Sequence, residues 1–173
     1  MISLLSTLIR HPLYWIAIML TGLFMESVAL YYQYGLDYGP CTLCTHVRAW
    51  VLAIVLTAAL GLVVRRQRVL NGLTHLSMFG LACGLLYSSW QTLGIERGWI
   101  EGSCEFGAGF PSWLPLHEWW PQVFEAWELC GYTPELWFGV TIAEALVVTA
   151  VLAVLFFIST TFAALKKTAS APA

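Results

Sequence analysis

The stretch AWVLAIVLTAALGLVV, residues 49–64, holds no charged side chain and is almost entirely apolar. A helix that is hydrophobic all round belongs in a large core or in a membrane, and about 20 mainly apolar residues are enough to cross a bilayer. Working outward from this stretch, the chain has four segments of that kind: residues 13–34, 43–64, 73–93 and 138–162. We therefore predict an all-α membrane protein, a four-transmembrane-helix bundle that forms one domain over residues 1–173.

The composition excludes several classes of protein. Of the 173 residues, 59% are hydrophobic and only 10% are charged, whereas a soluble domain carries roughly 25% charged residues. A soluble globular enzyme and a disordered protein are therefore excluded. The net charge of −2 gives no basic surplus with which to bind nucleic acid. The segments also lack the alternation within strands of about 10 residues that marks a membrane β-barrel.

Basic residues are concentrated in three of the segments outside the spans. Because cytoplasmic loops are enriched in Lys and Arg, we expect both termini and the second connection to be cytoplasmic, with outward loops at residues 35–42 and 94–137. The residues that carry this argument are Arg10, Arg65, Arg66, Arg68, Lys166 and Lys167. The small polar tail, residues 166–173, is expected to be disordered.

The cysteines divide into one intramembrane residue and four at the outward side. Cys83 lies in the middle of the third span, and we interpret it as a small hydrophobe packed in the core. Cys41, Cys44, Cys104 and Cys130 all fall in or beside the two outward loops. Disulfides persist on that side of a membrane, so these four residues are expected to form two pairs, for which three connectivities are possible.

Cys41 and Cys44 form a CxxC motif at the start of the second span, directly after Pro40. Free backbone N–H groups and the dipole at a helix start stabilise a thiolate, so the pair is predicted to be redox-active. Covalent haem attachment requires CxxCH, but Thr45 follows Cys44. A structural zinc site requires a second closely spaced ligand pair. No metal is therefore expected, although His46 and His117 keep a zinc site open as an alternative.

Three ionisable side chains lie inside the predicted spans. Arg48 follows Cys44 by four residues, which places it on the same helix face and about 6 Å deeper. It either extends to the lipid headgroups or stabilises the Cys44 thiolate and an anionic ligand. Glu26 and Glu144 each lie about 9–12 Å below the outward end of their span at helical rise. Their similar depth predicts that they face a common interior, where they are interpreted either as polar contacts between helices or as a proton relay.

The second outward loop contains an amphipathic segment. Its apolar residues recur at helical spacing, which predicts a short helix lying at the membrane interface. Pro121 cannot occupy a helix interior, so we expect a kink or a new helix start there. The residues of the apolar face are Leu116, Trp119, Trp120, Val123, Phe124 and Trp127.

Taken together, these features resemble the DsbB family of quinone-dependent disulfide-generating proteins of the bacterial inner membrane. The resemblance rests on four spans, on PCTLC at residues 40–44, on Arg48, and on Cys104 and Cys130 in the second outward loop. The sequence FPSWLPLHEWWPQVF, residues 110–124, is also similar to the loop of that family. The vitamin K epoxide reductase group shares the four-helix and CxxC theme, but its loop and cysteine arrangement fit less well.

The resemblance implies a mechanism and a location. A periplasmic DsbA-like thioredoxin-fold protein would attack a Cys104–Cys130 disulfide at Cys104. Electrons would pass to a Cys41–Cys44 pair and then to ubiquinone, or to menaquinone under anaerobiosis, with Arg48 stabilising negative charge beside Cys44. The expected activity is that of a protein-disulfide:quinone oxidoreductase. The protein would span the inner membrane and draw on its lipid and quinone pool.

One position departs from the family pattern. Family members often carry a His near the quinone at the outward end of the third span, where this chain has Gln91. We expect Gln91 to hydrogen bond a quinone carbonyl, although it cannot carry a positive charge. The alternative function is a non-enzymatic four-helix membrane adaptor whose disulfides are structural.

Overall fold

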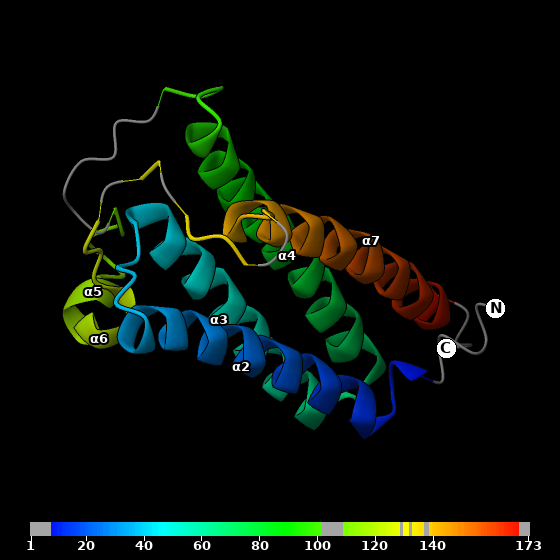
Figure 1. Cartoon of the computed structure of the whole chain (residues 1–173). Helices are drawn as coiled ribbons and strands as arrows, with labels where there is room; N and C mark the ends of the chain where they lie inside the picture. Colours follow the sequence, from blue (N-terminus) through cyan, green and yellow to red (C-terminus); the bar gives the residue numbers. More distant parts are fainter. Residues whose placement is uncertain (1–7, 102–108, 129, 132, 137–138, 170–173) are drawn as a thin grey trace.

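Four long helices dominate this computed structural model, which describes residues 8–101, 109–128, 130–131, 133–136 and 139–169 (Figure 1). Each long helix is long and apolar enough to cross a membrane, which confirms the predicted fold. Two short helices lie in the connection before the last one. In chain order the helices are α2 (Pro12–Gly35), α3 (Thr42–Val64), α4 (Arg68–Glu96), α5 (Leu116–Trp119), α6 (Pro121–Phe124) and α7 (Ile142–Ala169).

The long helices pack in chain order, α2 against α3, α3 against α4 and α4 against α7. Hydrophobic attraction adds little between helices in lipid, so close approach depends on small residues. Gly61 of α3 illustrates this, because a Cβ there would collide with the ring of the fully buried Trp15 of α2. Ala58 and Ala82 are also completely buried. Small side chains therefore let the helices pack closely in this part of the bundle.

The helix ends differ from the predicted spans in places. α4 begins at Arg68 rather than 73 and ends at Glu96 rather than 93, because its polar ends continue the helix beyond the apolar segment. α7 begins at Ile142 rather than 138, because Thr141 and Glu144 form reciprocal capping hydrogen bonds at its start. It also continues to Ala169, into the segment expected to be a disordered tail; residues 170–173 lie outside the described residues.

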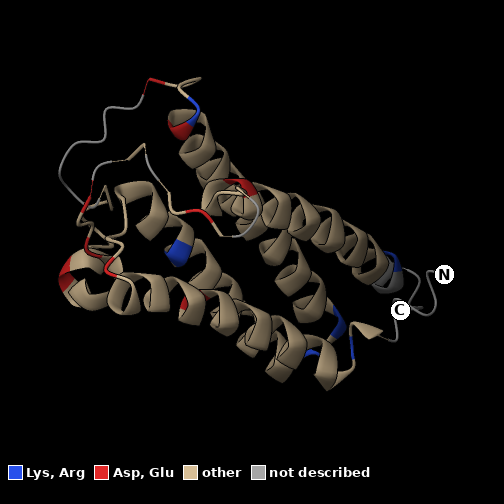
Figure 2. Ribbon diagram, in the orientation of Figure 1, with Lys and Arg blue, Asp and Glu red and all other residues tan. Residues whose placement is uncertain are grey.

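Charged side chains are separated between the two ends of the bundle (Figure 2). The basic residues at the start of α2, around the α3–α4 connection and at the end of α7 share one end, as the alternating directions of the long helices require. Most of the described acidic residues lie at the other end, around α5 and α6 and where α4 ends and α7 begins. Arg97 is an exception, because it pairs with Glu144 at the acidic end, and Glu26 of α2 and Arg48 of α3 lie away from the ends of their helices.

Cys83 does not pack in the core, contrary to the prediction. It is a free cysteine with an exposed side chain on α4. The neighbouring Ala82 and Leu85 are buried, and each residue along a helix turns by about 100°. Cys83 therefore points away from the bundle, toward the surface that lipid would cover.

The amphipathic segment is helical, but as two separate turns. α5 ends at Trp119 and α6 starts at Pro121, as the proline predicted. Phe124 is completely buried, whereas Trp119 and Trp120 are exposed. The segment is thus attached to the bundle through Phe124 and presents its tryptophans outward, as an interfacial position requires.

Candidate functional site

The CxxC motif forms the first turn of α3. Cys41 is the N-cap residue, and its sulfur accepts a hydrogen bond from the backbone N–H of Cys44 at 3.2 Å. The two cysteines are joined by a disulfide. Cys41 is only 3% exposed, whereas Cys44 is half-buried. The predicted position of the motif at a helix start is therefore confirmed, and Cys44 is the more accessible sulfur.

The chain segment that leads to Cys130 runs beside Cys41. Cys41 and Glu128 form an isolated parallel bridge, and the backbone N–H of Trp127 donates to the carbonyl of Pro40 at 2.9 Å. Cys130, two residues beyond Glu128, is itself disulfide-bonded. Cys104, its expected partner, lies outside the described residues. The structure thus brings the Cys130 segment next to the CxxC motif, although Cys44 and Cys130 are 86 positions apart in the chain.

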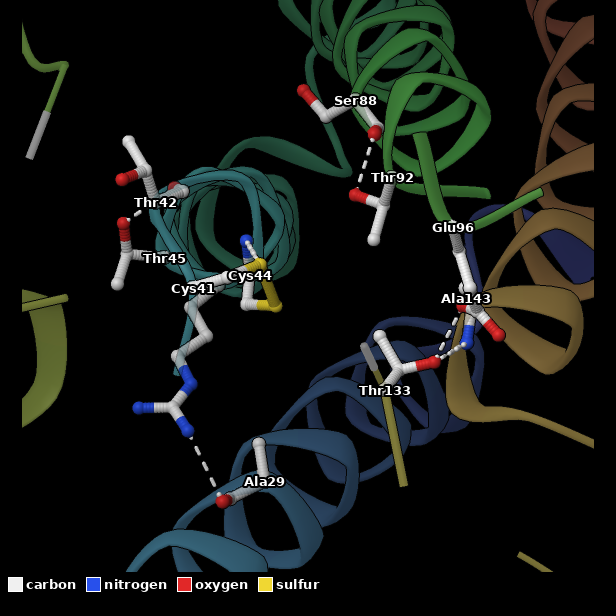
Figure 3. The surroundings of a disulfide bond; sticks show 11 residues. Ala29, Cys41, Thr42, Cys44, Thr45, Ser88, Thr92, Glu96, Thr133 and Ala143 are labelled. Atoms are coloured by element: carbon white, nitrogen blue, oxygen red, sulfur yellow. Dashed lines mark hydrogen bonds between the residues drawn. A yellow bond between two sulfur atoms is a disulfide. The ribbon is translucent and has the colours of Figure 1, made fainter. Parts of the chain in front are cut away.

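A cavity of about 240 Å³ lies directly beside the disulfide. Its walls come from α2, α3, the start of α7, Thr92 of α4 and the loop at residues 133–136, and Figure 3 shows the disulfide facing the space between Ala29, Thr92 and Thr133. Most of the lining is apolar. The chemically active groups that line it are Glu26, Cys44 and Arg48.

Arg48 is held by three hydrogen bonds and is only 6% exposed. Its Nη1 donates to Oε1 of Gln33 at 2.5 Å and to the carbonyl of Val123 at 2.9 Å. Its Nη2 donates to the carbonyl of Ala29 at 3.1 Å (Figure 3). A guanidinium needs such partners when it leaves water. Arg48 therefore lies in the cavity wall rather than extending toward headgroups, one turn of helix below Cys44.

Gln33 is a site residue that the sequence analysis did not identify. Its side chain is completely buried, and it contacts Arg48 rather than the cavity. A signal for it exists in the sequence. Gln33 follows Glu26 by seven residues, which is two helical turns, so these polar groups share one face of an apolar span.

The two predicted intramembrane carboxylates have different surroundings. Glu26 lines the cavity and interacts electrostatically with Arg48. Glu144 does not face the same interior, and the prediction of a shared environment is wrong. It lies in the first turn of α7, where it accepts from the backbone N–H of Thr141 at 3.2 Å and pairs with Arg97 of α4. Residue counting placed it too deep, because the helix starts four residues later than predicted.

Comparison with known proteins agrees with a disulfide-forming site at the CxxC motif. The family model described as "Disulfide bond formation protein DsbB" matches residues 11–160. This chain belongs to the DsbB family. It is 36% identical over 123 residues to disulfide bond formation protein B 2 of Pseudomonas aeruginosa, covering 70% of this chain and 73% of that protein.

Further relatives with the same name cover more of the chain. Disulfide bond formation protein B of Haemophilus influenzae is 31% identical over 152 residues, covering 86% of this chain and 84% of that protein. The Shewanella frigidimarina protein is 30% identical over 137 residues, covering 75% and 78%. As a member of the DsbB family with four helices able to cross a membrane, this chain is a multi-pass membrane oxidoreductase of disulfide bond formation.

Gln91, at the position where DsbB-family members often carry His, does not line the cavity. Its amide donates to the hydroxyl of Tyr87, one turn earlier on α4, at 2.6 Å, and Tyr87 is exposed. The cavity is lined instead by the adjacent Thr92. Sequence position alone could not distinguish these neighbours, because the rotation of α4 about its axis decides which one faces inward.

The two histidines considered as zinc ligands enclose an aromatic ring. The ring centroid of Phe110 lies 4.8 Å from that of His46 and 6.2 Å from that of His117. Within the described part of the chain, no group of three or more His, Cys, Asp and Glu residues is arranged to hold a metal ion. Phe110 also contacts Phe124 of α6. These rings attach the loop to the first turns of α3.

Proposed function

We propose that the chain reoxidises a periplasmic DsbA-like thioredoxin-fold protein and passes the electrons through two cysteine pairs to ubiquinone, or to menaquinone under anaerobiosis. It would thus act as a protein-disulfide:quinone oxidoreductase. The observation that carries the proposal is the cavity in which Cys44, Arg48 and Glu26 meet within apolar walls. A disulfide with only a structural role would not require a buried cation and a carboxylate beside it.

The residues around the cavity fit a quinone ring. Ligand sites are mostly apolar, with a few polar groups that fix orientation. The apolar walls, among them Phe24, Val47 and Leu146, suit the ring and its lipid tail, and the Arg48 guanidinium suits an oxygen that gains negative charge. A bound quinone would supply the two-electron acceptor and leave as quinol.

The four cysteines would carry the electrons from the protein donor to the quinone. Cys104 and Cys130 lie in the outward loop and would exchange with the protein donor, because a thiol–disulfide exchange needs a sulfur that an attacking thiolate can reach. Cys41 lies beside the Cys130 segment and would receive the electrons. Cys44 lines the cavity and would deliver them. Two pairs are needed because the donor stays in water and the quinone stays in lipid.

The charge distribution supports a location in the bacterial inner membrane. Described basic residues such as Arg10, Arg65 and Lys166 lie at the end where α2 begins and α7 ends. By the positive-inside rule, that end faces the cytoplasm together with both termini. The cysteine pairs then face the periplasm, where disulfides persist.

Quinone reduction by the purified protein tests this function directly. With a reduced DsbA-like donor and a short-chain ubiquinone, we expect one quinol per donor disulfide formed. The loss of quinone absorbance measures quinol formation. In membranes kept anaerobic without a terminal acceptor, thiol trapping should find the cysteine pairs reduced. If no donor supports quinone reduction and the disulfides stay closed, the adaptor alternative holds.

Glu26 is proposed to carry the proton that Cys44 loses. The dithiol gives up two electrons and two protons on forming the Cys41–Cys44 disulfide, and the same number is needed to make quinol. Glu26 faces the cavity beside Arg48, so its carboxylate would take the Cys44 proton and hold it for delivery into the cavity.

Glu26→Gln is therefore expected to slow quinone reduction by about 100-fold, the low end for loss of a positioned proton carrier. Steady-state kinetics with varied quinone measure this. Exchange between the donor and the outward pair, followed in a single turnover without quinone, should keep its rate. Glu144→Gln is the matched control, because that carboxylate pairs with Arg97 outside the cavity. Equal losses in the two variants would contradict the proton-carrying role.

A further inference from the structure

The bonds around Gln33 assign it a role at the proposed quinone site, although it does not line the cavity. Its Oε1 accepts from Nη1 of Arg48 at 2.5 Å, and its Nε2 donates to the carbonyl of Gln122 in α6 at 3.4 Å. The side chain is completely buried between these partners. We propose that Gln33 is a positioning residue that fixes the Arg48 guanidinium against the cavity; this inference rests on the proposed function.

Three hydrogen bonds fix the direction of the Arg48 guanidinium. Nη1 is shared between Gln33 and the Val123 carbonyl, and Nη2 bonds the Ala29 carbonyl. The backbone carbonyls cannot be removed by substitution. Gln33 is the one side chain among these three acceptors, so it is the hydrogen-bond acceptor of Arg48 that a substitution can change.

α6 supplies the other anchor of this arrangement. A helix leaves its last carbonyls without internal partners, and α6 is a single turn. Its Gln122 carbonyl accepts from Gln33 and from the hydroxyl of Tyr34, the latter at 2.7 Å. The Val123 carbonyl accepts from Arg48. Gln33 thus joins the guanidinium to a segment of the outward loop.

A neutral amide is the side chain that this position needs. A carboxylate at residue 33 would form an ion pair with Arg48 and reduce the positive charge that reaches Cys44. An apolar side chain would leave part of a buried guanidinium unpaired, which is costly. The Gln33 amide accepts from Arg48 and donates to the Gln122 carbonyl while leaving the charge of Arg48 available to the cavity.

Two full-length variants, Gln33→Glu and Gln33→Leu, test the proposal in detergent or nanodiscs. The first readout needs no quinone: the rate at which iodoacetamide alkylates Cys44 in the reduced protein, followed by peptide mass. We expect Gln33→Glu to lower this rate about tenfold, because a neutralised Arg48 stabilises less thiolate. The second readout is kcat/KM for quinone, expected to fall about 10- to 100-fold, as for loss of a charged hydrogen bond.

Tyr34→Phe is the matched control. It removes another hydrogen bond to the same Gln122 carbonyl and spares the bond between Gln33 and Arg48. Its alkylation rate and quinone kcat/KM should stay within about twofold of wild type, since exposed single hydrogen bonds contribute little. In all these variants the donor should be oxidised in a single turnover at the wild-type rate, which excludes misfolding.

A double variant decides whether Gln33 acts through Arg48. Effects of residues that work through one another are not additive, so Gln33→Leu combined with Arg48→His should lose no more than Arg48→His alone. Additive losses, or a Gln33→Glu protein with wild-type Cys44 alkylation, would overturn the proposal. If wild type does not reduce quinone, the proposed function fails, whereas the alkylation rates still decide the role of Gln33.

Discussion

We expect Cys44→Ser to abolish quinone reduction, while the protein keeps its fold. Cys44 lines the cavity, whereas its disulfide partner Cys41 is buried and is not among the lining residues. A serine oxygen cannot form the disulfide or give up two electrons at this position. The substitution removes one sulfur from a half-buried position and leaves the backbone N–H that bonds the Cys41 sulfur. The loss should therefore be chemical rather than structural.

The same variant should trap an internal disulfide. Without Cys44, the Cys41 thiol lies against the segment that carries Cys130. We expect Cys41 to attack Cys130 in the outward pair and to accumulate a Cys41–Cys130 bond, which leaves Cys104 as the free thiol in place of Cys41. Peptide mapping under non-reducing conditions detects this bond, and alkylation followed by peptide mass identifies the free thiol as Cys104 rather than Cys41.

Cys83→Ser is the matched control for Cys44→Ser. It removes a free sulfur from the exposed face of α4, far from the disulfide along the chain, and should leave quinone reduction unchanged. The measurement is quinol formation with a reduced DsbA-like donor in both variants. Residual turnover in Cys44→Ser would show that another group transfers the electrons.

Arg48→His is expected to produce the second large effect, a fall of about 100-fold or more in kcat/KM for quinone. The reason is the loss of a guanidinium that three hydrogen bonds to the protein hold in the cavity wall, where it would contact the quinone oxygen that gains charge. A hydrogen bond to a charged group contributes about 1.5–3 kcal/mol, and each 1.36 kcal/mol is about tenfold in rate, so the loss of a bond to that oxygen accounts for the expected fall. A shorter imidazole cannot reach the carbonyls of Ala29 and Val123 together.

Arg48→Lys separates charge from geometry. Lysine keeps a positive charge but lacks the planar fork that reaches several acceptors at once. We expect its quinone kcat/KM to lie between those of wild type and Arg48→His, with the donor KM unchanged in both variants. Steady-state kinetics with each substrate varied in turn measure this order. A wild-type quinone KM in Arg48→His would mean that the guanidinium does not contact the quinone.

The four spans were predictable from the sequence because crossing a bilayer is a local requirement. A run of apolar residues such as 49–64 satisfies it without reference to the rest of the chain. The start of α3 at the CxxC motif and the position of Arg48 one turn below Cys44 were predictable for a similar reason. Both follow from helical geometry within a few residues.

The positions of Glu144 and Gln91 required the structure. The capping of α7 by Thr141 moved its start to Ile142, so Glu144 lies at a helix end and not inside the bundle. The rotation of α4 turned Thr92 to the cavity and Gln91 toward Tyr87. A difference of one position along a helix, or a helix that starts later, is enough to place a side chain outside the cavity.

The sequence by itself determined the class of protein, the number of spans, the CxxC motif at a helix start and the cation beside it, because each depends on neighbours within one helix. Only the tertiary structure decided that Glu26 of α2 shares a cavity with Cys44 of α3, that Gln33 holds Arg48, and that the Cys130 segment runs beside Cys41. These contacts join residues from different elements. They arise from the packing of helices and loops, whose distances and rotations no local pattern specifies.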